Sequence, residues 1–471
     1  MSVFEVIDDD ALIYVFSFLR PPDIIAMRKT CKRMFAVSNL QIVWTNACNK
    51  HILKMGYPFS PHTLESLSLS ELEHQTYRAY HLASRWLSGY AMSNRKLFIE
   101  GTSNTSVSEV RFMPGHDGQW ILTVSKSIWD MVTIWDVSSD PRKCCEWSPR
   151  GAIFNGLALN SEPSCKGSIA ISVLKDGEHT VEILGIDLDV DHNYRLHPIR
   201  SINTTFRPVT LQGTLLAIGD DISETVIWDW TTGASASLQH PQDEADEWQH
   251  DKCIQVVFAY ESILVARARS LHLFPNPELH SEPKTYGPIA RHSFGWVDGI
   301  CVTSNPRLNT DQPLTILVRG ESDDPWSANT NALEFYTLAR EPTYPSLPSP
   351  YIFPPELSTQ VASTRGSLRC RDVILGPCGT AIWIQPQDRA VVGLVSPDED
   401  FPVQLIHRTS GHESIVAAVF PGPLRSKEAV SSRSRTLFTN RLNNWTSLDY
   451  DETLGKIALG SSFGRVMVLE L

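Results

Sequence analysis

The sequence lacks the features that mark a membrane-spanning, secreted or nucleic-acid-binding protein. No stretch approaches the 18 or so consecutive apolar residues of a membrane-spanning helix. The residues just before the first apolar run read EVIDDD, which is the wrong charge for a secretory signal. The formal net charge of −12 argues against the concentrated basic surface that nucleic-acid binding requires. We therefore expect neither a membrane nor a nucleic acid as a partner.

The cysteines lack the arrangement of a disulfide framework or a zinc site. Their number, nine, is odd, they are scattered along the chain, and no C-x-x-C pair is present. We interpret them as reduced thiols. This interpretation predicts that the protein is located in the cytoplasm, the nucleus or both.

Common catalytic and cofactor motifs are missing too. The chain has no Walker loop, no G-x-G-x-x-G opening a helix and no H-E-x-x-H. The stretch Gly460–Gly464 fits the G-x-S-x-G pattern of a nucleophile elbow, but an elbow is followed by a helix, and here the strand-like RVMVLEL follows. We interpret it as a hairpin turn. The sequence thus indicates no catalytic, cofactor-binding or metal-binding residue, and we predict that the protein is not an enzyme.

A short apolar run near the start of the chain is the first positive feature. Ala11–Leu19 contains one polar side chain, Ser17, and follows three aspartates that suit a helix N-terminus, which predicts a helix over about 9–19. Pro22 is placed to begin a second helix that runs to about Val37. Leu40 and Trp44 then anchor a third, short helix.

The first of these helices is apolar on nearly all sides. One face can line a small core with the next two helices, and the other face needs a cover. Three helices in about 45 residues bury too little surface to be comfortably stable alone. From the pattern alone, the cover is equally a partner protein or a later part of this chain.

This region resembles an F-box. The resemblance rests on IYVFSFL, RPPDII, TCKRMF and Trp44, and it covers residues 4–50. The sequence departs from the family at Ile7-Asp8, where the family usually has Leu-Pro. The resemblance implies docking on the Skp-type linker of a cullin-based ubiquitin ligase. It implies that the contact residues are Ile7, Leu12, Phe16, Leu19, Pro22, Ile24 and Ile25.

A long helix is predicted after the F-box-like region, over Ser68–Gly89. Ser70 and Glu73 have the spacing of a capping box, apolar residues follow one side, and Gly89 is placed as a stop. No flexible Gly/Ser linker precedes it. We therefore expect a fixed orientation between this helix and the F-box-like region.

The chain from about Val107 reads as all-β, with short apolar runs separated by turn residues. The runs form seven pairs about 40 to 70 residues apart, a spacing consistent with the blades of a WD-type β-propeller carrying loop insertions. Trp135-Asp136, Trp228-Asp229, Gly115-His116 and Gly411-His412 resemble WD-repeat elements. The predicted pairs are QWILTVSKS with MVTIWDV, GSIAISVLK with HTVEILGIDL, LLAIGDD with TVIWDW, SILVARA with SLHLFP, LTILVRG with ALEFYTL, TAIWIQP with AVVGLVS, and KIALGSS with RVMVLEL.

Two loops are weaker candidates for binding. The acidic stretch His240–Asp251 could hold a metal or a basic peptide, although a solvated loop is the simpler interpretation. The proline-rich stretch Thr343–Glu356 could lie extended across the surface or bind a partner.

The predicted fold class is α plus all-β: a helical F-box and a helical connector followed by a seven-bladed WD-type propeller. The expected domains are 1–50, 51–89 and 90–471. Together they resemble the substrate receptors of SCF-type ubiquitin ligases, which bind the linker, and through it a cullin, and present a target protein. The target and its binding residues stay unknown. A propeller scaffold outside ubiquitin ligation and, more remotely, a propeller enzyme are the alternatives.

Overall fold

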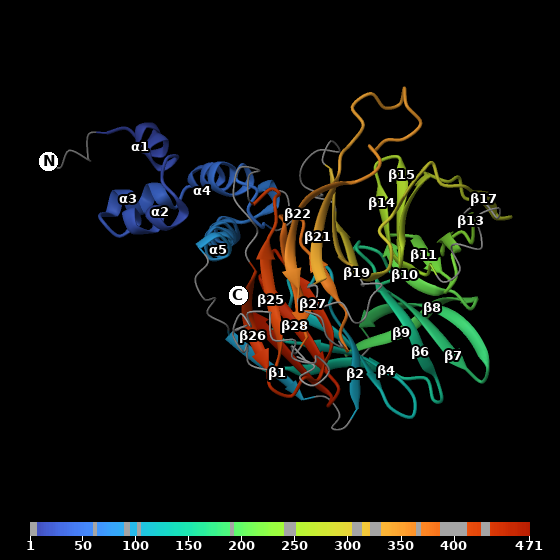
Figure 1. The fold of residues 1–471 in the computed structure, drawn as a ribbon. Coiled ribbons are helices and arrows are strands. Elements are labelled where there is room, and N and C mark those ends of the chain that lie inside the picture. Colours follow the sequence, from blue (N-terminus) through green and yellow to red (C-terminus); the bar gives the residue numbers. More distant parts are fainter. Residues whose placement is uncertain are drawn as a thin grey trace, which may run out of the picture.

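The computed structural model shows a few N-terminal helices followed by a seven-bladed β-propeller, which confirms the predicted fold class (Figure 1). None of the described helices is both long enough and apolar enough to span a bilayer. None of the nine cysteines, all of which are described, forms a disulfide. The structure describes residues 7–59, 64–88, 95–100, 105–188, 193–239, 251–303, 313–320, 331–363, 369–386, 412–424 and 434–471.

The first helices are shorter than the sequence predicts. The first ends at Phe16, and the chain continues to Leu19 in tighter turns with bonds between residues three apart. The single helix predicted over 22–37 is wrong: it is two helices, because the amide and hydroxyl of Thr30 both bond back to one carbonyl and Cys31 is extended. The helical elements are α1 (Asp9–Phe16), α2 (Pro21–Arg28), α3 (Lys32–Ser38), α4 (Gln41–Cys48), the π-helical η2 (Asn49–Leu53), the 3₁₀ turn η3 (Leu64–Ser66) and α5 (Leu69–Ser88).

The predicted long helix is present as α5, but its cap lies elsewhere. The Ser68 hydroxyl accepts from the Glu71 amide at 3.4 Å, and the Glu71 carboxylate accepts from the Ser68 amide at 2.9 Å. The capping box therefore starts two residues before the one predicted from Ser70 and Glu73. Glu73 instead pairs with Arg28 of α2.

The propeller consists of seven sheets, here called blades 1 to 7 in chain order. In each blade the first strand lines the central channel. A fifth strand, β17, joins the edge of blade 3 in parallel. The strands are, for blade 1, β2 (Ser106–Phe112), β3 (Trp120–Lys126), β4 (Met131–Asp136), β5 (Arg142–Trp147); blade 2, β6 (Ile153–Leu159), β7 (Ile169–Lys175), β8 (Glu178–Leu188), β9 (Tyr194–Asn203); blade 3, β10 (Arg207–Gln212), β11 (Leu215–Gly219), β12 (Thr225–Asp229), β13 (Ser235–Leu238), β17 (Lys284–Tyr286); blade 4, β14 (Cys253–Ala259), β15 (Ser262–Arg267), β16 (Ser270–Pro275), β18 (Ala290–Ser293); blade 5, β19 (Val297–Thr303), β20 (Leu314–Gly320), β21 (Asn331–Leu338), β22 (Glu356–Ser363); blade 6, β23 (Val373–Leu375), β24 (Thr380–Gln385), β25 (Glu413–Val419), β26 (Arg435–Asn440); and blade 7, β27 (Trp445–Asp451), β28 (Lys456–Ser461), β29 (Arg465–Glu470), β1 (Arg95–Glu100).

Six of the seven predicted strand pairs are neighbouring strands in the structure. The prediction that TAIWIQP pairs with AVVGLVS is wrong, because its strand β24 pairs with β25, more than 25 residues further along the chain. AVVGLVS itself lies outside the described residues. An apolar run of the right length was mistaken for the partner strand, which shows that pattern alone does not fix pairing across a long connection.

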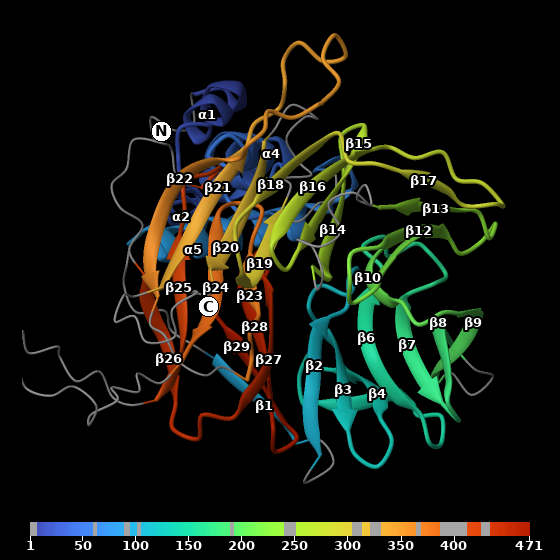
Figure 2. The ribbon, with the colours of Figure 1, turned by 45° about the vertical axis from the view of Figure 1, so that its right-hand side comes forward.

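The two ends of the β region share one blade. β1 runs antiparallel to β29, from Arg95 opposite Glu470 to Glu100 opposite Arg465. In Figure 2 the blue strand β1 lies beside the red strands of blade 7. This pairing closes the ring and removes the free edge that an open sheet would expose.

Helix α5 belongs to two hydrophobic cores at once. Leu72 and Ala79 pack in the core of the small helices. Further along the same helix, Leu82 and Trp86 are buried against blades 6 and 7, where Leu471 is also packed. Figure 1 shows α5 between α1–α4 and the red strands. The helix thus ties the two parts of the chain together.

The strand directions give the propeller two distinct faces. The turns between the first and second strands of each blade lie on the side that α5 contacts, for example at Leu454, whose carbonyl accepts from Arg78. We call this side the α5 face. The loops between the second and third strands, and the links into the next blade, lie on the other side, which we call the opposite face.

Candidate functional site

The outer surface of α1 and of the turn that follows it carries an apolar stripe that no other described part of the chain buries. Tyr14, Val15 and Phe18 are 67%, 50% and 56% exposed, and with Ala11 they follow the spacing of one helix face. We call these four residues the outer stripe. The inner face of the same helix is fully used, because Leu12 and Phe16 are 3% and 1% exposed.

A hollow of about 640 Å³ runs beside the outer stripe. Asp10, Ile13 and Tyr14 of α1 line it on one side, and Asn49, Lys50 and Lys54 line it from the segment after α4. The Lys50 ammonium lies 4.1 Å from the centre of the Phe18 ring, within cation–π range. An apolar ridge thus stands beside a polar and basic wall, an arrangement that can receive an amphipathic helix carrying acidic groups.

One arginine of α2 bonds to both α3 and α5. Arg28 on α2 makes a two-pronged ion pair with Glu73 of α5, at 2.7 and 2.6 Å. Its Nε also donates to the Ser38 hydroxyl at 3.0 Å, and the Ser38 carbonyl accepts from the Trp44 indole at 2.9 Å. The side chains of Arg28 and Glu73 are only 18% and 23% exposed. Paired groups at this depth orient α2, α3 and α5 relative to one another.

The seven residues implied by the F-box resemblance lie at different depths. Leu12, Phe16 and Ile24 are buried in the core of the small helices, so they support the surface from within. Ile7, Leu19, Pro22 and Ile25 are partly exposed. The sequence predicts a second apolar face of this helix that needs a cover, but the contact residues implied by the resemblance do not include Tyr14, Val15 and Phe18, which form it.

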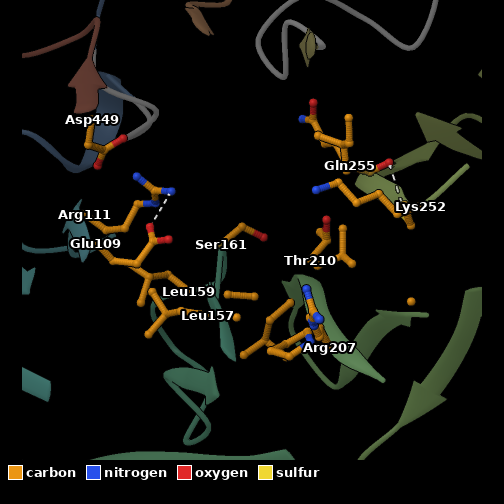
Figure 3. Close-up of a pocket in the computed structure, with 18 of the residues that line it drawn as sticks. Glu109, Arg111, Leu157, Leu159, Ser161, Arg207, Thr210, Lys252, Gln255 and Asp449 are labelled. Carbon is orange, nitrogen blue, oxygen red and sulfur yellow. Dashed lines mark hydrogen bonds and ion pairs between the residues drawn. The ribbon is translucent and has the colours of Figure 1, made fainter. Parts of the chain in front are cut away.

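The central channel of the propeller is the second candidate. A cavity of about 590 Å³ is lined by residues of β2, β6, β10 and β14 (Figure 3). The Arg111 guanidinium and the Glu109 carboxylate form an ion pair of 2.7 Å there. Arg111 also donates to the carbonyls of Val110 and Leu448, at 3.0 and 3.1 Å. Arg111 therefore joins blade 1 to blade 7.

In the channel, Arg111 and the nearby carboxylates stabilise each other's charged forms. Burial raises the pKa of the Glu109 carboxyl, and Arg111 opposes that rise. Burial also acts to lower the pKa of Arg111, but Glu109, Asp372 and Asp449 outweigh it, so the pKa of Arg111 lies above its ordinary value. Arg111 is thus a permanent cation that stabilises the surrounding carboxylates.

Several other polar groups of the channel are used between blades. Gln255 exchanges two hydrogen bonds of 2.8 Å with the backbone of Val302, and Thr210 donates to Val256 at 2.8 Å. No histidine lines the channel in the described part of the chain. Among the described residues no cluster of His, Cys, Asp or Glu could hold a metal ion. The side chains of Gln255 and Thr210 thus link neighbouring blades along the channel.

The family comparison agrees with this architecture. Residues 5–46 match the F-box domain family. The chain fits an F-box/WD-repeat type protein. A search of curated proteins finds no match to this chain. F-box domains bind Skp-type linkers, and an F-box joined to a propeller is typical of non-catalytic adaptor proteins.

The remaining sequence candidates have separate outcomes. Residues 240–250 of the acidic stretch lie outside the described residues. Ser462 and Phe463 lie between β28 and β29, so the G-x-S-x-G match is a hairpin turn, as predicted. The proline-rich stretch forms most of the connection between β21 and β22 on the α5 face, where Leu347 is 47% exposed.

Proposed function

We propose that this protein is a substrate receptor of an SCF-type ubiquitin ligase. The observation that carries the proposal is the outer stripe, because it lies within the F-box match and is exposed although the whole propeller is present. Of the two covers that the sequence left open, a partner protein is therefore the one we propose. Leaving three large apolar side chains in water would otherwise favour aggregation.

The linker contact combines the outer stripe with its partly exposed neighbours. In this proposal Ile7, Leu19, Pro22 and Ile25 extend the contact beyond the outer stripe. Leu12, Phe16 and Ile24 act indirectly by holding α1 and α2 in the packed arrangement. The basic wall at Lys50 and Lys54 favours acidic groups on the linker.

The propeller holds the target while a cullin, bound through the linker, carries the ubiquitin-transferring subunits. A receptor of this kind acts by raising the effective concentration of target lysines near the transfer site. It forms no covalent bond itself. We propose functional units at 1–50, 51–89 and 90–471, and a location in the cytoplasm, the nucleus or both.

The test is a pull-down of purified linker by full-length protein carrying Tyr14→Ser and Val15→Ser. These two exposed side chains carry little of the folding energy, so binding should fall about tenfold or more while the thermal unfolding midpoint changes little. Met55→Ser is the matched control, because Met55 is also 50% exposed but lies outside the outer stripe. Unchanged linker binding by the double variant would refute the proposal.

Substitution of buried residues does not test the contact. Phe16→Ala with Ile24→Ala removes two side chains from the core of the small helices. Each truncation should cost about 2–5 kcal/mol of stability. The small helices should then unfold, and loss of linker binding would follow from unfolding alone.

A further inference from the structure

A cleft lies at the place where the ring closes. It has a volume of about 350 Å³ and is formed between blade 7, at β1 and β29, and blade 1, at β3, β4 and β5. Ile99 and Val466 line it from blade 7, and Met131 and Trp135 line it from blade 1. We call it the closure cleft.

Two hydroxyl groups inside the closure cleft have no partner among the described residues. Thr133 is 2% exposed and Ser125 is 8% exposed, and both line the cleft. The neighbouring Thr123 hydroxyl already has two partners, since it accepts from the Trp135 indole at 3.0 Å and donates to the Thr133 carbonyl at 3.4 Å. Both hydroxyls still reach the water in the cleft, since neither is among the fully buried polar atoms that lack a partner. A ligand that offers a carbonyl or an amide would bond to them in place of that water.

The charges at the rim of the closure cleft are paired. Lys143 and Glu146 form an ion pair of 2.8 Å, and Glu100 lies 3.6 Å from Arg465. Each pair combines one positive and one negative group. The rim therefore favours an uncharged ligand over an acidic or basic one.

The two hairpin turns next to the closure cleft, on the opposite face of the propeller, carry exposed apolar side chains. Ile128 and Trp129, 86% and 40% exposed, lie in the loop that leads into Met131. Phe463, 58% exposed, directly precedes Gly464, which lines the cleft. Large apolar groups on both lips of a cavity are typical of a binding site.

We propose that the closure cleft binds a short, uncharged segment of the target protein. One apolar side chain enters the cavity, and the main chain beside it bonds to the hydroxyls of Ser125 and Thr133. The volume suits a short segment, because it is near the lower end of the range of about 300–1,000 Å³ for ligand pockets. That the segment belongs to a target protein rests on the proposed function, but binding of a peptide in the cleft does not.

The test begins with a phage-displayed library of random peptides selected on the full-length protein. Dissociation constants of the selected peptides are then measured by fluorescence anisotropy. Three cleft variants are compared with the wild type: Trp129→Ser with Phe463→Ser at the lips, Met131→Glu in the cavity, and Thr133→Val, which removes one hydroxyl and keeps the shape. The matched control is Ile222→Ser with Leu442→Ser, since these residues are 56% and 66% exposed in other loops of the opposite face.

The expected result is enrichment of uncharged peptides that contain a large apolar residue. The lip and cavity variants should weaken their binding about tenfold or more, Thr133→Val should weaken it by a smaller factor, and the control should leave it unchanged. Thr133→Val and the lip variant keep the test valid if Met131→Glu fails to fold.

Three results would overturn the inference. The first is that no peptide is selected, and the second is that selected peptides bind the cleft variants as tightly as the wild type. The third is a dimer of the wild-type protein that the lip variant abolishes, which would make a second copy of the chain the occupant. Linker pull-down on the same samples separates the two proposals: a wild-type protein that does not bind the linker refutes the proposed function, whereas unaltered peptide affinity of the cleft variants refutes only the closure cleft.

Discussion

At the scale of single residues, the ion pair between Arg28 and Glu73 is expected to contribute more than its exposed counterparts. Glu73→Gln leaves a half-buried guanidinium without its carboxylate and should destabilise the small helices by about 1–3 kcal/mol. Asp23→Asn is the control, because it breaks a pair with Arg20 in which both side chains are exposed, and it should change stability far less than Glu73→Gln does. Unfolding followed by far-ultraviolet circular dichroism measures both. Equal effects would contradict the role given to Arg28.

A glycine controls how closely the helices approach the propeller. Gly56 has a φ of +65°, and a Cβ added there would lie 2.2 Å from the carbonyl oxygen of Pro423 on the α5 face. Gly151 also has positive φ, +79°, but a Cβ there meets nothing within 4 Å. Alanine at either position should cost about 1–2 kcal/mol of backbone strain. Only Gly56→Ala should in addition separate the small helices from the propeller.

Small-angle scattering and limited proteolysis of the two alanine variants would distinguish strain from separation. Gly56→Ala should increase the radius of gyration and expose the segment around Gly56 to cleavage. Gly151→Ala should keep the wild-type radius. An unchanged radius in both variants would show that the contact at Pro423 does not position the helices.

At the scale of secondary-structure elements, the second half of α5 should act as the anchor on the propeller. Trp86 is 3% exposed, its ring packs edge-on to Tyr450, and Arg435 lies 4.9 Å above it. Trp86→Ala should therefore cost about 3–5 kcal/mol. Its neighbour Leu87 is 45% exposed, and Leu87→Ala should cost about 0.5 kcal/mol or less. Thermal unfolding of the two variants measures the difference, and a similar loss in both would argue against α5 as an anchor.

The elements also show what the sequence could and could not predict. Strands such as β7 and β15 are buried along nearly their whole length, so they could be predicted from unbroken apolar runs in the sequence. The break between α2 and α3 was not, because the closing bonds of Thr30 depend on local geometry that periodicity does not encode. The partner of β24 was missed because a long connection separates it from β25. The cavity at the closure cleft was beyond prediction, since it is formed by blades at opposite ends of the β region.

At the scale of the whole molecule, the propeller and α5 should behave as one folding unit. A fragment beginning at residue 90 lacks α5 and exposes the apolar surface that Leu82 and Trp86 cover. A fragment beginning at residue 68 retains that cover. We expect the shorter fragment to unfold at a lower temperature and to aggregate more readily. Equal midpoints and equal solubility would show that the propeller core ends at its strands.

Closure of the ring predicts a second effect of truncation. Removal of residues 465–471 takes away β29 and leaves β1 without its partner strand. It also removes Val466, Val468 and Leu469 from the buried cores. The loss of stability should far exceed that of trimming a frayed end. A truncated protein with the wild-type unfolding midpoint would contradict the closure described here.

The pairing of β1 with β29 has a consequence for synthesis of the protein on the ribosome. At about 5–20 residues per second, about 20–70 s separate the appearance of Glu100 from that of its partner Arg465. During that interval the nascent chain carries a complete F-box sequence but an open ring, with Leu97 and Ile99 of β1 awaiting their partner strand. The linker can therefore meet its site before the propeller exists, and a nascent chain stalled before β29 would still recruit it. Ribosome profiling selective for linker-bound nascent chains would detect this early assembly.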